Sequence, residues 1–324
     1  MVQKIQTQVR LFAADNDHTM VGYFAGAVPA WREQLPKIAK RLGISEEVAG
    51  RKLGTVFAKF ATHDYPWAVA LAFHQYWKGS VKDFVRLIEK PFWDAQDKYR
   101  EKYVKPYNGV EKALTELQKL NIPAVVVSDA PMFMCIARLV SSGLAKYFQG
   151  VYALECKAPD LTLVPSEEWL RFGTRRISQL NRKYKEHGIK FVRELPIDHE
   201  KPDPRGIQLA MKDFGVHPGQ VIHVGDSLPK DGVLGLTAGL RGFFYTPYHA
   251  IGHLPAEYLE YITGVLKPET DEYDGHGATT ATSKPLVSAP PMLGQGSFGG
   301  ALDHLGFHSQ ADYLELKAER LFRA

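Results

Sequence analysis

Residues 9–19 read VRLFAADNDHT, and this stretch decides how the rest of the chain is interpreted. The compact apolar run over residues 9–14 predicts a short buried strand, because it stops abruptly at Asp15. Asp17 follows two positions later, although like charges placed so close together repel each other. A bound cation would offset that repulsion, so the stretch predicts a strand that ends at a cation site.

The composition is that of an ordinary globular protein. The chain has 324 residues, of which 45% are hydrophobic and 23% charged, enough for one large or two medium domains. A formal net charge of +4 is too weak to imply a nucleic-acid or membrane partner. Cys135 and Cys156 are the only cysteines, which excludes a disulfide framework and fits a reducing compartment. With no signal-like segment and no 18-residue apolar run, we expect a cytoplasmic protein.

Strand-like and helical segments alternate after residue 105. The predicted strands cover residues 122–128, 150–154, 221–224 and 242–245, and the predicted helices cover residues 110–120, 131–144, 204–214 and 233–238. Such alternation is typical of a parallel sheet with helices on both faces. We therefore predict an α/β fold with a Rossmann-like, doubly wound parallel sheet, whose active edge lies where the strands end.

A helical domain is predicted as an insertion in this sheet domain. Apolar residues recur at helical spacing over residues 27–103, and Ser45 ahead of two glutamates is a plausible helix start. The sheet domain then comprises residues 1–22 and 105–250, and the helical cap residues 23–104.

Two further segments depart from the alternation. Residues 156–197 are predicted as an insertion with a helix over residues 166–187 and a modest basic excess. Residues 251–324 form a C-terminal extension. Its Gly-, Pro- and Ser-rich part, residues 268–306, predicts a flexible linker, and residues 310–322 predict a short amphipathic helix.

Carboxylates follow two of the predicted strands. Asp15 ends the first strand, Asp226 in HVGDSLPKD ends another, and Asp231 lies in the loop after it. Several hard oxygen ligands at one sheet edge indicate magnesium chemistry. Ser128, which ends a strand, and Lys201, which precedes a helix, would add a hydroxyl donor and an ammonium for phosphoryl oxygens. Each residue alone is more often a cap or turn residue, so the inference rests on the combination.

Four elements of the sequence, taken in chain order and with their predicted strands and helices, resemble the four motifs of the haloacid dehalogenase (HAD) superfamily: DNDHT, Ser128, Lys201 and GDSLPKD. The segment KPDPRGIQLAMKDFGVHPGQVIHVGDSLPKDGVLGLTAGLRGFFY resembles its phosphoglycolate phosphatase-like branch. The resemblance covers residues 8–250 without the insertion, and the helical block lies where that family inserts a type-one cap. It implies a HAD-like phosphoric monoester hydrolase, a Mg²⁺-dependent phosphatase that acts on a small phosphorylated metabolite through an aspartyl-phosphate.

The resemblance also implies the catalytic roles. Asp15 would be the nucleophile that attacks phosphorus. Asp17 would protonate the leaving oxygen and then deprotonate the hydrolytic water. Ser128 would donate to a phosphoryl oxygen, and Lys201 would stabilise both Asp15 and the transition state. Because dehalogenases of this superfamily lack an acid at the position of Asp17, its presence favours phosphate esters.

Binding roles are implied in the same way. The backbone NH groups of Asn16 and Asp129 would hold the phosphoryl group, and Thr19 would orient the loop. Mg²⁺ would be held by four residues: Asp15, Asp17 through its backbone carbonyl, Asp226, and Asp231 directly or through water. Seven cap residues are candidates for substrate contact, although aromatic residues at helical spacing more often form the cap core: Tyr23, Phe24, His63, Tyr65, Trp67, His74 and Trp77. His18, where the family usually has Gly, and Lys230, where Asn is frequent, depart from the pattern.

Alternative functions stay open. A phosphomutase would keep both Asp15 and Asp17. A binding or interaction protein could use the basic insertion and the C-terminal helix, and a phosphatase acting on nucleic-acid ends would combine both ideas. We expect a small phosphorylated substrate and neither a membrane nor a nucleic-acid partner. A homo-oligomer formed through the cap or the C-terminal helix is compatible with the sequence.

Overall fold

A seven-stranded parallel sheet forms the centre of the protein, as the alternation of segments predicted. The computed structural model describes residues 9–182, 189–246, 255–267, 292–295 and 301–302. The strand order is β4-β3-β2-β1-β5-β6-β7, and every pairing is parallel. The strands are β1 (Leu11–Ala14), β2 (Ala124–Pro131), β3 (Phe148–Leu154), β4 (Phe191–Leu195), β5 (Val221–Gly225), β6 (Gly242–Tyr245) and β7 (Met292–Gln295).

β1 occupies the middle of the sheet, between β2 and β5. Its last residue, Ala14, is in register with Val126 on one side and Val224 on the other. Parallel strands expose their carboxyl ends at the same edge, so the loops after β1, β2 and β5 emerge next to each other. The backbone NH of Asp15 donates to the carbonyl of Val224 at 2.9 Å, which fixes the start of the first loop against β5.

Helices cover both faces of the sheet because successive strand residues point to opposite faces. Leu11 and Ala13 pack on the side of α9 (Arg205–Phe214) and α10 (Val233–Thr237). Phe12 and Ala14 pack on the side of α6 (Val110–Lys119) and α7 (Met132–Ser141). The four residues of β1 are all buried, and this explains why the sequence shows a continuous apolar run.

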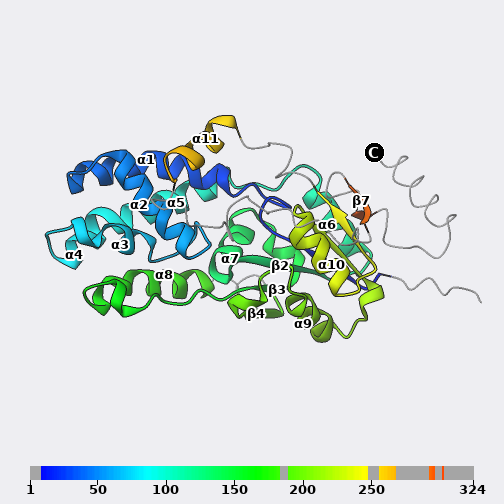
Figure 1. Ribbon diagram of the computed structural model, residues 1–324. Helices are drawn as coiled ribbons and strands as arrows, with labels where there is room; N and C mark the ends of the chain where they lie inside the picture. The colour runs from blue at the N-terminus through cyan, green and yellow to red at the C-terminus, as the bar shows by residue number, and fades with distance from the viewer. Residues whose placement is uncertain (1–8, 183–188, 247–254, 268–291, 296–300, 303–324) are drawn as a thin grey trace, which may run out of the picture.

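The helical layer gathers at one end of the molecule, away from most of the sheet (Figure 1). It contains α1 (Phe24–Leu42), α2 (Glu46–Lys59), α3 (Ala68–Phe73), η1 (His74–Tyr76), α4 (Val81–Phe84), a π-helical turn η2 (Val85–Glu89) and α5 (Lys90–Tyr103). Ser45 caps α2 as predicted, since its hydroxyl accepts from the backbone NH of Val48 at 3.2 Å. None of the helices in the described part of the chain combines the length and apolar character that a bilayer span requires.

The segment predicted as an insertion contains a strand of the sheet. Residues Phe191–Leu195 form β4, which pairs with β3 at the sheet edge. Before it come two short turns, η4 (Leu161–Leu163) and η5 (Glu167–Leu170), and then α8 (Arg171–Arg182). The predicted helix over residues 166–187 is therefore present in part, and its last residues lie outside the described part of the chain. The alternation of apolar and polar residues along β4 is weak, because its edge position leaves two residues exposed.

The C-terminal extension differs from its prediction where it is described. Residues 256–264 form α11 (Ala256–Gly264), which contacts α1. Within the predicted linker, Met292–Gln295 form strand β7, and Ala301 and Leu302 are buried in the core of the sheet domain. The linker prediction is wrong at these positions, because a Gly- and Pro-rich composition does not prevent four residues from pairing with an open sheet edge. The predicted helix over residues 310–322 lies outside the described residues.

Candidate active site

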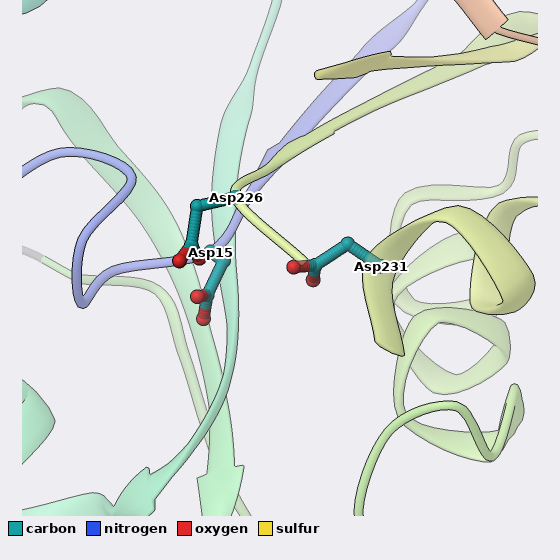
Figure 2. A group of neighbouring side chains, drawn as sticks. All are labelled: Asp15, Asp226 and Asp231. Atoms are coloured by element: carbon teal, nitrogen blue, oxygen red, sulfur yellow. The ribbon is translucent and has the colours of Figure 1, made fainter. Parts of the chain in front are cut away.

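Three carboxylates from different parts of the sequence meet at the carboxyl edge of the sheet. Oxygen atoms of Asp15, Asp226 and Asp231 all lie within 4.8 Å of one another. Figure 2 shows Asp15 and Asp226 at the ends of neighbouring strands and Asp231 pointing toward them from the turn that follows. Asp15 follows β1, Asp226 follows β5, and Asp231 belongs to η9 (Leu228–Gly232). Since β1 and β5 are paired, their chain ends bring the first two carboxylates together.

Lys201 holds two of these carboxylates. Its ammonium nitrogen Nζ lies 2.8 Å from Oδ1 of Asp15 and 2.7 Å from Oδ1 of Asp231. The same oxygen of Asp231 lies 2.9 Å from Nε2 of His223 on β5, and Oδ2 accepts from the backbone NH of Ser227 at 3.2 Å. Asp231 therefore orients Lys201 and is itself fixed from three sides.

Gly225 makes this arrangement of Asp231 sterically feasible. A Cβ atom at position 225 would lie 2.2 Å from Cγ of Asp231, closer than non-bonded atoms approach. The glycine in the sequence HVGDS therefore lets the carboxylate of Asp231 lie directly against the end of β5.

Burial and crowding shift the pKa of each carboxyl group. Burial raises the pKa of Asp15 above its usual range, although Lys201 opposes the shift. Burial also raises the pKa of Asp226 well above its usual range, with Asp15 adding to the effect. Asp231 differs, because Lys201 and His223 outweigh the effect of burial and hold its pKa below the usual value. Burial is thus the largest cause of the raised pKa values of Asp15 and Asp226, whereas ion pairing dominates at Asp231.

Asp17 is held by a buried arginine. Nη1 of Arg138 on α7 donates to Oδ2 of Asp17 at 2.5 Å, and Nη2 donates to Oδ2 of Asp64 in the helical layer. The guanidinium of Arg138, only 2% exposed, also lies 4.3 Å from the ring centroid of Tyr23. Burial raises the pKa of Asp17 to about 7 against the opposing effect of Arg138, with Asp64 adding to the rise. The side chain of Arg138 therefore joins the loop after β1 to the helical layer.

The loop after β1 has a defined internal geometry. His18 adopts a left-handed backbone with φ of 59°, a conformation that favours glycine. Asn16 is fully buried, and its side-chain amide donates to Oδ1 of Asp17 at 3.3 Å. The hydroxyl of Thr19 donates to Oδ1 of Asp226 at 3.1 Å. Thr19 thus links this loop to the carboxylate after β5.

Ser128 and Asp129 belong to β2, which is paired with β1. Ser128 is buried two residues beyond Val126, and its hydroxyl accepts from the backbone NH of Ala130 at 3.2 Å. Asp129 uses its carboxylate to accept from the backbone NH of Lys201 at 2.9 Å and from Nζ of Lys230 at 3.0 Å. Lys230 also donates to Glu200 at 2.6 Å, so this departure from the family pattern forms ion pairs beside the site.

A cavity of about 470 Å³ opens next to Asp17, between the helical layer and the ends of β2 and β3. Of the aromatic and histidine residues proposed for substrate contact, Tyr23, His63 and Tyr65 line it. Trp67 instead lies in the core of the helical layer, where its indole NH donates to the carbonyl of Leu170 at 2.8 Å. This hydrogen bond also ties the segment before α8 to the helical layer.

Sequence reasoning missed two polar groups of the site, Arg138 and His223. Arg138 is the only charged residue in the helix MFMCIARLVS, and His223 interrupts the apolar strand VIHVG. A lone polar residue in a segment predicted to be buried is the signal that could have identified both, because a buried charge needs a partner.

The fold and the acidic edge define the class: a doubly wound α/β domain with carboxylates and a lysine at the ends of its central strands. Residues 199–247 match the family described as HAD-hydrolase-like. The matched part of the chain contains Lys201, Asp226 and Asp231. No curated protein matches the chain.

Solved structures with similarity to this chain include several HAD proteins. A HAD phosphatase from Thermococcus onnurineus has 17% identity and a TM-score of 0.46, with 74% of this chain and 86% of that chain covered. A 2-haloacid dehalogenase from Pseudomonas syringae has 19% identity and a TM-score of 0.46 at the same coverage. A predicted phosphoglycolate phosphatase from Haemophilus somnus has 18% identity, a TM-score of 0.42, and coverage of 75% and 87%.

Proposed function

We propose that the protein is a Mg²⁺-dependent phosphomonoester hydrolase acting on a small phosphorylated molecule. The observation that carries the proposal is the position of Asp15 at the end of β1. Its carboxylate lies 2.8 Å from Nζ of Lys201 and within 4.8 Å of two further carboxylates. The HAD-like match over residues 199–247 includes Lys201, Asp226 and Asp231 and supports the same conclusion.

The donor set fits a magnesium ion. Asp15, Asp226 and Asp231 offer hard oxygen ligands, and a divalent cation among them would offset the burial and the mutual repulsion that raise the pKa values of Asp15 and Asp226. We assign these three side chains and the backbone carbonyl of Asp17 as the groups that would hold it. When bound, Mg²⁺ would neutralise charge on the phosphoryl group and the nucleophile.

In the proposed reaction, a carboxylate oxygen of Asp15 attacks phosphorus while the bond from phosphorus to the leaving oxygen breaks. Asp17 gives its proton to that oxygen, consistent with a pKa near 7 that leaves part of the population protonated at neutral pH. Water then attacks the aspartyl-phosphate as Asp17 takes its proton. Phosphate leaves and Asp15 is regenerated.

The surrounding residues position these groups. Lys201 neutralises Asp15 before and during attack, and Asp231 fixes Lys201 through a 2.7 Å contact. We assign the hydroxyl of Ser128 and the backbone NH groups of Asn16 and Asp129 to the phosphoryl oxygens, as the resemblance implies.

The test is phosphate release from p-nitrophenyl phosphate and a panel of metabolites, with Mg²⁺ and with EDTA. Asp15→Asn should abolish turnover, whereas Asp94→Asn, an exposed carboxylate on α5, should not. Activity that survives both EDTA and Asp15→Asn would refute the proposal. Accumulation of a product isomer in place of free phosphate would instead identify a phosphomutase.

The structure gives part of the inserted segment a packing role, which weakens the argument for a binding protein. Leu180 of α8 packs in a buried cluster with residues of α7, and Arg176 forms a two-pronged ion pair with Asp97 of α5 at 2.6 and 2.9 Å. Partners beyond a small phosphorylated substrate, and an oligomeric state, stay predictions. A cytoplasmic location also stays a proposal, with two free thiols, Cys135 and Cys156, in its favour.

A further inference from the structure

The cavity beside Asp17 has a largely apolar wall. Phe60 and Tyr65 stack with their ring centroids 3.8 Å apart and their planes 8° from parallel, and both line the cavity. The hydroxyl of Tyr65 is bonded to the carbonyl of Lys157 at 3.1 Å, which fixes the ring. The same wall includes the apolar residues Pro131, Leu154, Pro159 and Ile197.

Charged groups on the wall are largely paired with one another. Lys230 contacts Asp129 and Glu200 at 3.0 and 2.6 Å, and Lys157 contacts Glu155 at 2.8 Å. On the cap side, Asp64 is bonded to Arg138, and Arg138 in turn holds Asp17. Lys59 and Asp160, which also line the cavity, are exposed to solvent. Along the paired part of the wall, a second ionised group on a substrate would have to displace an existing ion pair to find a partner. At the exposed Lys59 it would meet only a solvent-screened charge, which contributes little.

From this wall we infer that the cavity receives an uncharged, mainly apolar leaving group, of which an aryl ring is the simplest. The inference rests on the proposed function, since Asp17, the proposed acid, lines the same cavity. A volume of about 470 Å³ is ample for a ring system and far exceeds what a two-carbon acid needs. Phosphoglycolate would place a carboxylate against this wall, so it is not the expected substrate despite the branch that the sequence resembles.

A matched pair of substrates tests the inference. Phenyl phosphate and 4-carboxyphenyl phosphate differ only by a distal carboxylate, which if anything makes the phenol a better leaving group. We expect kcat/KM to be at least about 10-fold higher for phenyl phosphate, because the charged ring enters an apolar wall. Equal values, or a preference for the carboxylated substrate or for phosphoglycolate, would overturn the inference.

Ile197 offers a local probe, because it is 50% exposed and so tolerates substitution. Ile197→Ala should lower kcat/KM for phenyl phosphate by about threefold through the loss of apolar contact. Ile197→Lys should reduce the discrimination against 4-carboxyphenyl phosphate by a similar factor. The control is Leu259→Ala, which removes an exposed leucine of α11 outside the cavity and should change neither value. Unchanged kinetics in both Ile197 variants would contradict the assignment.

Binding of the non-hydrolysable phenylphosphonate and 4-carboxyphenylphosphonate, measured by calorimetry, separates the two proposals. If phenylphosphonate binds more tightly than 4-carboxyphenylphosphonate but no ester is hydrolysed, the cavity assignment is supported and the proposed phosphatase activity is refuted. Hydrolysis of many esters with no preference for the uncharged ring would support the phosphatase and refute the cavity assignment.

Discussion

The buried carboxyl group of Glu89 predicts that the stability of the helical layer depends on pH. It ends η2, is 0% exposed, and neither of its carboxyl oxygens has a hydrogen-bond partner within the described part of the chain. Burial raises its pKa well above the usual 4.5. The folded protein therefore keeps a proton on Glu89 that the unfolded chain releases as the pH rises above about 4.5.

The size of the effect follows from this one proton. Because the native state binds more protons than the unfolded state, the free energy of unfolding falls by up to about 1.4 kcal/mol per pH unit above the ordinary pKa. The loss continues until the pH reaches the folded-state pKa. Glu89→Gln keeps the shape of the side chain but removes its titratable carboxyl group. Between pH 5.5 and 7.5, the variant should gain up to about 2.7 kcal/mol relative to the native protein, or roughly 5 °C in Tm.

Urea and thermal unfolding followed by circular dichroism at pH 5.5, 6.5 and 7.5 would measure this difference. Glu101→Gln, at an exposed position of α5, is the matched control and should show no such trend. A stability difference between Glu89→Gln and the native protein that does not change with pH would refute the reasoning.

Three further predictions concern the ion pairs that join the helical layer to the rest of the protein. Arg138→Met should cost about 3 kcal/mol in the free energy of unfolding, because it leaves two partly buried carboxylates, with side chains 19% and 14% exposed, without their cation. Arg138→Lys should recover only part of this loss, and native-like stability of the Met variant would contradict the prediction. Asp64→Asn removes a negative charge that raises the pKa of Asp17. The limb of the pH profile of kcat/KM near pH 7 should therefore move to lower pH, and a limb at the native position would contradict this prediction. Arg176→Met should destabilise the protein by about 1–2 kcal/mol, because it breaks a two-pronged pair between the buried Arg176 and the half-buried Asp97, which keeps Arg100 as a partner at 2.7 Å. The exposed Arg175→Met should change stability by less than about 0.5 kcal/mol.

Most of the sheet could be predicted from the sequence because its central strands are buried on both faces. Residues 11–14 and 221–225 are apolar runs that end at an aspartate or a glycine, and such runs are recognisable without knowledge of their neighbours. The edge strands β4 and β7 were missed for the opposite reason. An edge strand is covered on fewer sides, so its composition carries little signal, and its pairing depends on the neighbouring strand.

The sequence by itself determined which residues could carry the chemistry, since Asp15, Ser128, Lys201 and Asp226 lie in motifs whose order and local context are written along the chain. Only the tertiary structure decided that Arg138 joins Asp17 to Asp64, that Lys230 pairs with Asp129 and Glu200, and that a cavity with an apolar wall lies beside them. The physical reason is that a motif is local, whereas a charge balance is set by groups far apart in sequence. Arg138 is 121 residues from one partner and 74 from the other, and no pattern along the chain records which carboxylates a buried guanidinium will meet.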